Sequence, residues 1–447
     1  MRWLWCIAVG ASLIGSVVVM PVIAQDLTAE AVLEDIAQFR EQFLDRDQAY
    51  APAAREEAQR RLARLEQSAD TLDGVRLGLG LAQIAALADN GHSASMPGPR
   101  IQRSNRLAIR FVPMEDGFVV LRARHAHTDL LGARLLAIDG QALARLREVA
   151  HTLSGGPPAW RDRSAPFLFE SPQQLFALGL AKEPGEALYR LALADGRIVE
   201  TRLLAESPSA ERPTADTESL LLPEVMPAEM GWAGVLDTAS APWSLRDARE
   251  PLRWRHDPAL QALVLDMRAM ADSRSLTLID FFEQMRAAAS QHQPEHLVLD
   301  LRQNGGGDLT RIRDFAESLP ALVPGRLFVL TGPWTFSAAI STLGYLKQAA
   351  PARVTIVGEP VGDRLEFFAE GRFVWLKHSG EVLLPATERH DYVNACRSFT
   401  DCHGPVRRRP IAVRTLEPDI AAPWTLGAYS QGLDPALQAV AATLQRP

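Results

Sequence analysis

The sequence is poor in cysteine and has no excess of basic residues, and each shortage narrows the possible functions. Only 3 of the 447 residues are cysteine, so no more than one disulfide can form within the chain. The formal net charge is −7, and no basic stripe with interleaved aromatic side chains occurs, which argues against nucleic-acid binding. With 47% hydrophobic and 23% charged residues the composition is that of a folded protein. We therefore expect the partner to be a peptide or a protein.

The long apolar run from Leu4 to Val22 lies at the N-terminus, directly after Arg2. It ends with the small residue Ala24, before a polar sequence starts at Gln25. A charged start, an apolar middle and a small-residue exit are typical of a secretory signal, which we place at residues 1–24. An uncleaved membrane anchor is the alternative, because the run approaches the roughly 20 residues that span a bilayer. We expect cleavage, a periplasmic or secreted protein, and no stable membrane insertion afterwards.

The three cysteines separate into one within the signal segment, Cys6, and two close together, Cys396 and Cys402. Two neighbouring cysteines in an exported chain most simply form a disulfide. The loop that this bond would close is short, so the gain in stability is modest. A metal site that also uses His390 and His403 is the alternative, but the spacing matches no zinc pattern.

The length of the chain indicates several domains. Removing 24 of the 447 residues leaves 423, which is too many for one compact core and suggests two or three domains. Residues 25–100 carry apolar side chains at helical intervals and predict an N-terminal helical unit. The polar stretch 207–217 contains two prolines and predicts a linker. A larger domain is expected at 218–447.

A small β domain is expected at residues 101–206. The run from Leu130 to Gln141 predicts a strand and an Asp-Gly turn into a helix. This run resembles the peptide-binding PDZ-type modules that accompany bacterial serine proteases. A second strand pair around Asp195-Gly196 would close the domain. Residues 153–171 are rich in Gly, Pro and Arg and predict a long insertion.

The last part of the chain alternates apolar runs with helical segments. The expected strands are Ala262–Met267, Leu297–Leu301, Leu327–Thr331 and Val354–Val357. The expected helices are Leu276–Ser290, Leu309–Ser318 and Ala338–Ala349. This alternation predicts an α/β core with a mostly parallel sheet that is covered on both sides. The fold class is therefore α/β and β multidomain, with the site of the core beyond the carboxyl ends of its strands.

Two segments beyond such strand ends suggest a serine nucleophile and the loop that holds its oxyanion. The glycines 305–307 let the backbone turn with its N–H groups exposed. Ser337 follows the next expected strand and starts a helix, where the field favours developing negative charge. Either piece alone could be a flexible turn or an ordinary helix cap. Their conjunction predicts a catalytic site.

Four motifs carry a resemblance to a known family. They are Asp300-Leu301-Arg302-x-Asn304-x-Gly306-Gly307, Thr335-x-Ser337-Ala338-Ala339, Val357-Gly358-Glu359-Pro360-x-Gly362, and Pro418-Asp419-Ile420 with Gly432-Leu433-Asp434-Pro435. In this order they resemble the serine peptidases of the C-terminal processing (tail-specific) protease and tricorn-core family. The resemblance covers the chain from about Gly231 to its end. It implies a crotonase-like core and a nucleophile at Ser337.

The hydroxyl of Ser337 needs an adjacent base to become a nucleophile. The resemblance implies either a lysine soon after the Val-Gly-Glu-Pro segment or a histidine that precedes the core. Asp363 stands where the lysine would be, and Lys347 lies about 15 Å along the helix from the serine. The segment Asp89–Ser93 resembles the one by which tricorn-like members supply histidine. We therefore expect His92 to be the general base, because imidazole titrates near neutral pH.

The resemblance also implies that the backbone N–H groups of Gly306 and Ala338 form the oxyanion hole. The acid that would orient the histidine is not assigned. Four carboxylates remain candidates for it: Glu388, Asp391, Glu417 and Asp363.

The expected function is an exported serine endopeptidase that cleaves extended peptide or protein substrates through an acyl-enzyme at Ser337. It would need no metal and no organic cofactor. The missing lysine and the unassigned acid motivate an alternative, a catalytically inactive periplasmic peptide-binding protein on the same scaffold. An acyl hydrolase for other substrates is a third possibility, because a fold does not fix a substrate.

Overall fold

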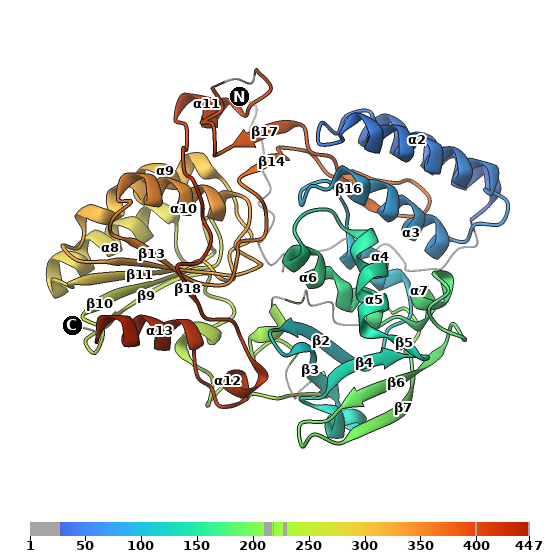
Figure 1. Cartoon of the computed structure of the whole chain (residues 1–447), viewed down its shortest axis with the longest axis horizontal. Helices are drawn as coiled ribbons and strands as arrows, with labels where there is room; N and C mark the ends of the chain where they lie inside the picture. The colour runs from blue at the N-terminus through green and yellow to red at the C-terminus, as the bar shows by residue number, and fades with distance from the viewer. Residues whose placement is uncertain (1–26, 210–216, 218, 227–229, 398–399, 446–447) are drawn as a thin grey trace. The chain divides into compact units, whose positions relative to one another are not determined.

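A computed structural model of the chain describes residues 27–209, 217, 219–226, 230–397 and 400–445 (Figure 1). The expected signal segment, 1–24, and most of the expected linker lie outside these residues. The chain forms two compact units. The α/β unit holds the described residues of Ser240–Glu366 and His390–Pro447, and the N-terminal unit holds those up to Ala239 together with Phe367–Arg389. Among the described residues, no helix combines the length and the apolar character needed to cross a membrane.

The α/β unit is built on a six-stranded sheet with the strand order β18-β13-β12-β11-β10-β9. Its strands are β9 (Leu252–Asp257), β10 (Ala262–Met267), β11 (His296–Asp300), β12 (Leu327–Thr331), β13 (Val354–Gly358) and β18 (Ile420–Ala421). Every neighbouring pair is parallel except β9 with β10. The expected mostly parallel sheet is therefore confirmed, with an antiparallel edge strand in addition.

Helices cover both faces of this sheet (Figure 1). They are α8 (Leu278–His292), α9 (Leu309–Ser318) and α10 (Ala338–Ala349) on one face and α13 (Pro435–Leu444) on the other. The short helices α11 (Gly404–Arg408) and α12 (Leu426–Ser430) lie in the C-terminal segment. Val264, Val298 and Phe328 of the strands share a buried cluster with Ala436 and Val440 of α13. Burial on both faces explains why these strands are almost continuous apolar runs.

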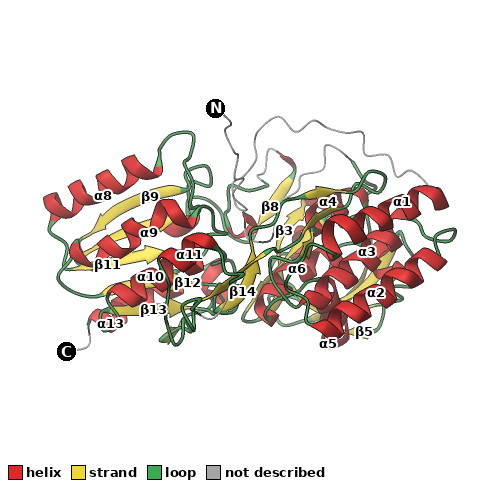
Figure 2. Cartoon of the chain, turned by 90° about the horizontal axis from the view of Figure 1, so that it is seen from above, coloured by secondary structure: helices red, strands yellow, loops and turns green. Residues whose placement is uncertain are grey.

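The helical part of the N-terminal unit consists of α1 (Ala29–Phe39), α2 (Pro52–Gln67) and α3 (Gly74–Ala85), which pack side by side (Figure 2). A three-stranded sheet belongs to the same unit, in the order β1 (Ala94–Ser95), β16 (Val382–Leu384) and β15 (Val374–Trp375). Leu376 and Leu383 join the core of the helices. Residues 367–389 thus leave the α/β unit, although the sequence analysis places all of 218–447 in one domain.

The β part of the N-terminal unit is a seven-stranded sheet whose main path is β2-β3-β4-β6-β7. The strands are β2 (Ile109–Met114), β3 (Gly117–Arg124), β4 (Arg134–Ile138), β5 (Gln141–Ala142), β6 (Glu186–Ala192), β7 (Ile198–Leu204) and β8 (Trp232–Gly234). The helices are α4 (Pro97–Arg103), α5 (Leu143–Ala150), α6 (Pro158–Phe169) and α7 (Pro172–Ala177).

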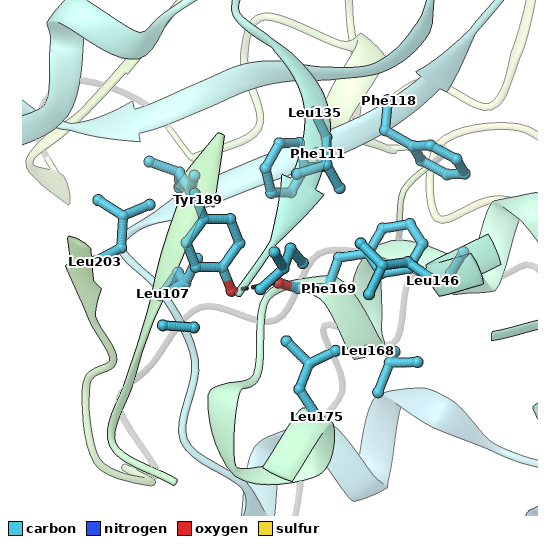
Figure 3. Close-up of a cluster of buried hydrophobic side chains, with 14 of the residues drawn as sticks. Leu107, Phe111, Phe118, Leu135, Leu146, Leu168, Phe169, Leu175, Tyr189 and Leu203 are labelled. Carbon is cyan, nitrogen blue, oxygen red and sulfur yellow. Dashed lines mark hydrogen bonds between the residues drawn. The ribbon is translucent and has the colours of Figure 1, made fainter. Parts of the chain in front are cut away.

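The stretch 153–171, expected as an insertion, contributes to the core of this β part (Figure 3). Its helix α6 buries Leu168 and Phe169 among Phe111, Phe118 and other strand residues. The Tyr189 hydroxyl donates a hydrogen bond to the Phe169 carbonyl at 2.7 Å. This stretch is therefore a structural element of the domain, and Pro157 and Pro158 mark the start of α6.

The strands β14 (Glu366–Ala369) and β17 (Glu388–Asp391) form a separate two-stranded sheet. Both strands cross the boundary between the two units along the chain. The chain enters the N-terminal unit for the second time through one strand and leaves it through the other.

Candidate active site

Ser337 lies between the end of β12 and the start of α10, at the carboxyl edge of the parallel sheet. Its backbone has φ 53° and ψ −124°, a conformation that residues other than glycine rarely adopt. The serine makes no capping hydrogen bond to its helix, so the hydroxyl is not used as an N-cap. A strained backbone at a partly exposed serine is typical of functional sites.

The glycine turn after β11 lies directly against this serine. A Cβ atom added to Gly306 would lie 2.6 Å from the Ser337 Cβ and 3.1 Å from the Ala338 nitrogen. The φ angle of Gly306 is 108°, which also favours glycine. The structure therefore brings Ser337, Gly306 and Ala338 together, as their spacing and motifs predict.

Asn304 holds this arrangement from inside. Its side-chain Nδ2 donates to the Met267 carbonyl at 2.6 Å, and its Oδ1 accepts from the Gly306 N–H at 2.9 Å. Its own carbonyl accepts from the Phe336 N–H at 3.0 Å. One buried side chain thus links the end of β10, the glycine turn and the loop of the serine. To act as the expected oxyanion donor, the Gly306 N–H would have to turn from Asn304 or share its hydrogen bond.

Thr335 fixes the loop of the serine from the other side. Its hydroxyl donates to the Leu301 carbonyl at 2.8 Å and accepts from the Gly332 N–H at 3.0 Å. Its carbonyl accepts from the Gly362 N–H at 2.9 Å. Three of the four sequence motifs therefore meet at the serine through hydrogen bonds.

A chain of buried polar groups lies beneath the first turn of α10. The hydroxyls of Ser341 and Tyr392 lie 2.6 Å apart, and Nδ1 of His390 lies 3.0 Å from that tyrosine oxygen. The ring of His390 stacks on His403 with 5.1 Å between centroids. The chain reaches the backbone of Ser337, because the Ser341 N–H donates to its carbonyl at 3.2 Å.

A disulfide joins Cys396 and Cys402 close to this chain, with 6.0 Å between their Cα atoms. Both cysteines are buried, and the bond links positions six residues apart between Tyr392 and His403. The disulfide thus constrains the segment that holds the polar chain in place.

The fourth motif forms a buried ion network. The Arg302 guanidinium donates to Asp300 at 2.6 Å and 3.0 Å and to Asp434 at 2.8 Å and 2.9 Å. Burial raises the pKa of Asp434, but Arg302 and a hydrogen bond from Ser244 lower that pKa by more than burial raises it. The pKa of Asp434 therefore lies below the usual range. Burial and the neighbouring Asp266 and Asp434 charges raise the pKa of Asp300, which Arg302 opposes. These residues fix the C-terminal helix α13 to the sheet.

His92 lies in the N-terminal unit, in the turn that follows α3. It is 7% exposed, and its ring stacks on Phe367 at 5.2 Å with 9° between the planes. Asn90 anchors the turn, because its amide donates to the Phe368 carbonyl at 3.0 Å and accepts from the Phe368 N–H at 2.9 Å. Asn90 also donates to Ser93 at 3.0 Å. The imidazole is therefore held in a fixed orientation.

The stretch 153–171 supports the turn of His92. A Cβ atom added to Gly155 would lie 2.6 Å from the backbone N and O of Asn90. Arg161 of α6 forms an ion pair with Asp89. Sequence patterns gave no sign of this support, since it depends on close backbone packing.

The candidate acids have different surroundings. Asp391 accepts hydrogen bonds from the Val393 and Asn394 N–H groups and so closes a turn. Glu417 is exposed, Glu388 is half-buried in β17, and Asp363 is buried and accepts from the Arg364 N–H at 2.9 Å. None of these contacts selects an acid for the histidine.

Lys347 is engaged elsewhere: its Nζ donates to the Val354 carbonyl at 2.9 Å. Ser337, Gly306 and Ala338 thus lie together in the α/β unit, whereas His92 lies in the N-terminal unit. Their pairing remains a prediction.

The chain is similar to several solved structures. Mature CPAF has a TM-score of 0.56 at 13% identity, over 93% of this chain and 97% of that one. CPAF complexed with lactacystin has a TM-score of 0.54 at 12% identity, over 93% of this chain and 98% of that one. The photosystem II D1 C-terminal processing protease has a TM-score of 0.33 at 14% identity, over 91% of this chain and 98% of that one. No protein-family model and no curated protein sequence matches the chain. The fold of this chain is therefore similar to that of mature CPAF.

Proposed function

We propose that the chain is a serine endopeptidase of the C-terminal processing and tricorn type, with Ser337 as the nucleophile. One observation carries the proposal: the strained serine at the N-terminus of α10 lies against Gly306, whose glycine turn is the expected oxyanion loop. The same contact would have no purpose in an ordinary helix cap. The shared fold with a serine protease supports the same activity.

In the proposed reaction His92 takes the hydroxyl proton of Ser337 while Oγ bonds to the scissile carbonyl carbon. The N–H groups of Ala338 and Gly306 stabilise the oxyanion that forms. Ala338 is the first residue of its helix, so its N–H has no partner within that helix. The imidazolium then gives its proton to the leaving amine, and an activated water hydrolyses the acyl-enzyme. Ser337 regains its proton in that step.

The proposed substrate is an extended peptide or protein segment in the periplasm or outside the cell. The β part of the N-terminal unit, which we interpret as PDZ-like, is a candidate surface for binding that segment by strand addition. The proposed export agrees with the disulfide, because such bonds persist in oxidising compartments.

A fluorophosphonate probe tests the proposal, because it labels only an activated serine. We expect labelling of the wild type, none of Ser337→Ala, and a decrease of at least about 100-fold in His92→Ala. Ser430→Ala and His125→Ala remove exposed residues of the same types and are the controls. A folded wild-type protein that is not labelled would instead favour the inactive peptide-binding protein. A His92→Ala variant labelled at the wild-type rate would exclude this histidine as the base.

A further inference from the structure

Two polar side chains beyond the ends of neighbouring strands have no hydrogen-bond partner within the part of the chain that the structure describes. They are Gln303, with both the oxygen and the nitrogen of its amide, and Trp334, with its indole Nε1. All three atoms are buried, and the Trp334 side chain is 5% exposed. Buried polar groups without partners destabilise a fold, so each one needs an explanation, and a partner supplied by a bound molecule is one such explanation.

Both residues belong to the loops that form the serine site. Gln303 follows β11 and Trp334 follows β12, and these strands are parallel neighbours. The residue after Gln303 accepts a hydrogen bond from the Phe336 N–H, which directly precedes the nucleophile. Gln303 is also three residues from Gly306, at most about 11 Å along an extended chain. Gln303 therefore lies on the same loop as Gly306, the expected oxyanion donor.

The neighbours of Gln303 are committed to the interior. Arg302 donates to Asp300 and Asp434, and Asn304 bonds to Met267 and to the glycine turn. Gln303 is the position between them that the motif leaves open, and the fold makes no use of its amide. A primary amide offers one acceptor and two donors in one plane, which complements the N–H and C=O of a peptide bond.

We propose that Gln303 binds the main chain of an extended peptide beside the scissile bond, with the Trp334 N–H as a second donor to a peptide carbonyl. The inference rests on the proposed peptidase function and names the contact that recognises its substrate. Because both groups bind main chain, the contact adds affinity for any extended peptide and little selection among side chains. It also distinguishes a peptide from a simple acyl ester, which lacks the N–H.

Two serine-directed reagents test this inference on the full-length protein. An alkyl fluorophosphonate reaches the nucleophile without a peptide, whereas a mixed-sequence pool of tetrapeptidyl diphenyl phosphonates requires main-chain binding. Gln303→Met keeps the length of the side chain and removes both polar atoms. Gln291→Met, at an exposed position of α8, is the matched control. Trp334→Phe keeps an aromatic ring without the N–H.

We expect Gln303→Met to lower the labelling rate of the peptidyl pool about tenfold, the effect of two hydrogen bonds. The alkyl rate should stay within about twofold, and the melting temperature should equal or exceed that of the wild type. Trp334→Phe should lower peptidyl labelling about threefold to fivefold. Equal losses with both reagents, an unchanged peptidyl rate, or unfolding of Gln303→Met would each overturn the inference. No alkyl labelling of the wild type would instead defeat the proposed function, and the inference with it.

Discussion

Replacement of Gly306 by alanine tests the contact on which the site depends. The new Cβ atom would lie 2.6 Å from the Cβ of Ser337, whereas ordinary van der Waals contact starts near 3.4 Å. The Ala338 nitrogen and the Phe336 oxygen, both 3.1 Å away, leave little room to move aside. The two loops must therefore separate by about 0.8 Å, and a displacement near 1 Å can cost about 100-fold in rate.

The substitution also changes stability in two separable ways. An alanine at φ 108° costs about 1–3 kcal/mol in backbone strain, and the steric overlap adds about 1–3 kcal/mol. The variant Gly117→Ala distinguishes backbone strain from steric overlap, because the φ of Gly117 is 115° and no atom lies within 4 Å of its added Cβ. Gly117→Ala should therefore show the strain alone.

Fluorophosphonate labelling and urea unfolding measure both effects. We expect Gly306→Ala to be labelled about 100-fold more slowly than the wild type, and Gly117→Ala at the wild-type rate. The free energy of unfolding should fall further in Gly306→Ala than in Gly117→Ala. If both variants are labelled like the wild type, Gly306 does not hold the nucleophile and the argument from the contact is refuted.

Three further predictions concern the framework of the site. Asp434→Asn should lower the free energy of unfolding by about 3–5 kcal/mol at pH 7, because it leaves Arg302 without its second carboxylate. The folded-state pKa of Asp434 is depressed. The stabilisation by Asp434 is therefore present above its unfolded pKa of about 3.9 and is lost as the pH falls through the lower folded value. A difference in the free energy of unfolding between variant and wild type that stays constant from pH 7 to 3 in urea unfolding would contradict this. Tyr392→Phe should slow fluorophosphonate labelling by about threefold to tenfold, since the Ser341 hydroxyl loses a buried partner, and a rate equal to that of the wild type would show that the polar chain does not position the nucleophile. Cys402→Ser should cost about 2 kcal/mol, the loop-closure estimate for a six-residue separation, and reducing agent should destabilise the wild type but not this variant in the same urea assay.

The sequence predicted the core of the α/β unit well, because its signals are local. Apolar runs between helical segments mark strands buried on both faces, and the expected helix Ala338–Ala349 agrees with α10. The edge strand β9 was not predicted, since Leu252–Asp257 contains charged residues between its apolar ones and lacks the continuous apolar run of the central strands. The meeting of Ser337 with the glycine turn was predicted from topology, because the carboxyl ends of parallel strands share one edge.

Other features depend on contacts between distant segments, which a single sequence does not reveal. The return of Phe367–Arg389 to the N-terminal unit is one, because β16 pairs with β1 almost 300 residues earlier. The roles of Asn304 and Thr335 are another, since their hydrogen bonds join three loops. The Gln303 amide is a third, because its lack of a hydrogen-bond partner among the described residues depends on where all the neighbouring groups lie.

The anchoring of the Asn90 turn to Phe368 has a consequence for the order in which the molecule matures. Synthesis delivers a polypeptide from its amino end, so His92 emerges long before the strand that fixes its turn. Between them comes the serine at position 337. Phe368, which anchors the turn, therefore arrives only after this serine has been made, and a nascent or truncated chain that stops short of residue 368 lacks the partner of Asn90.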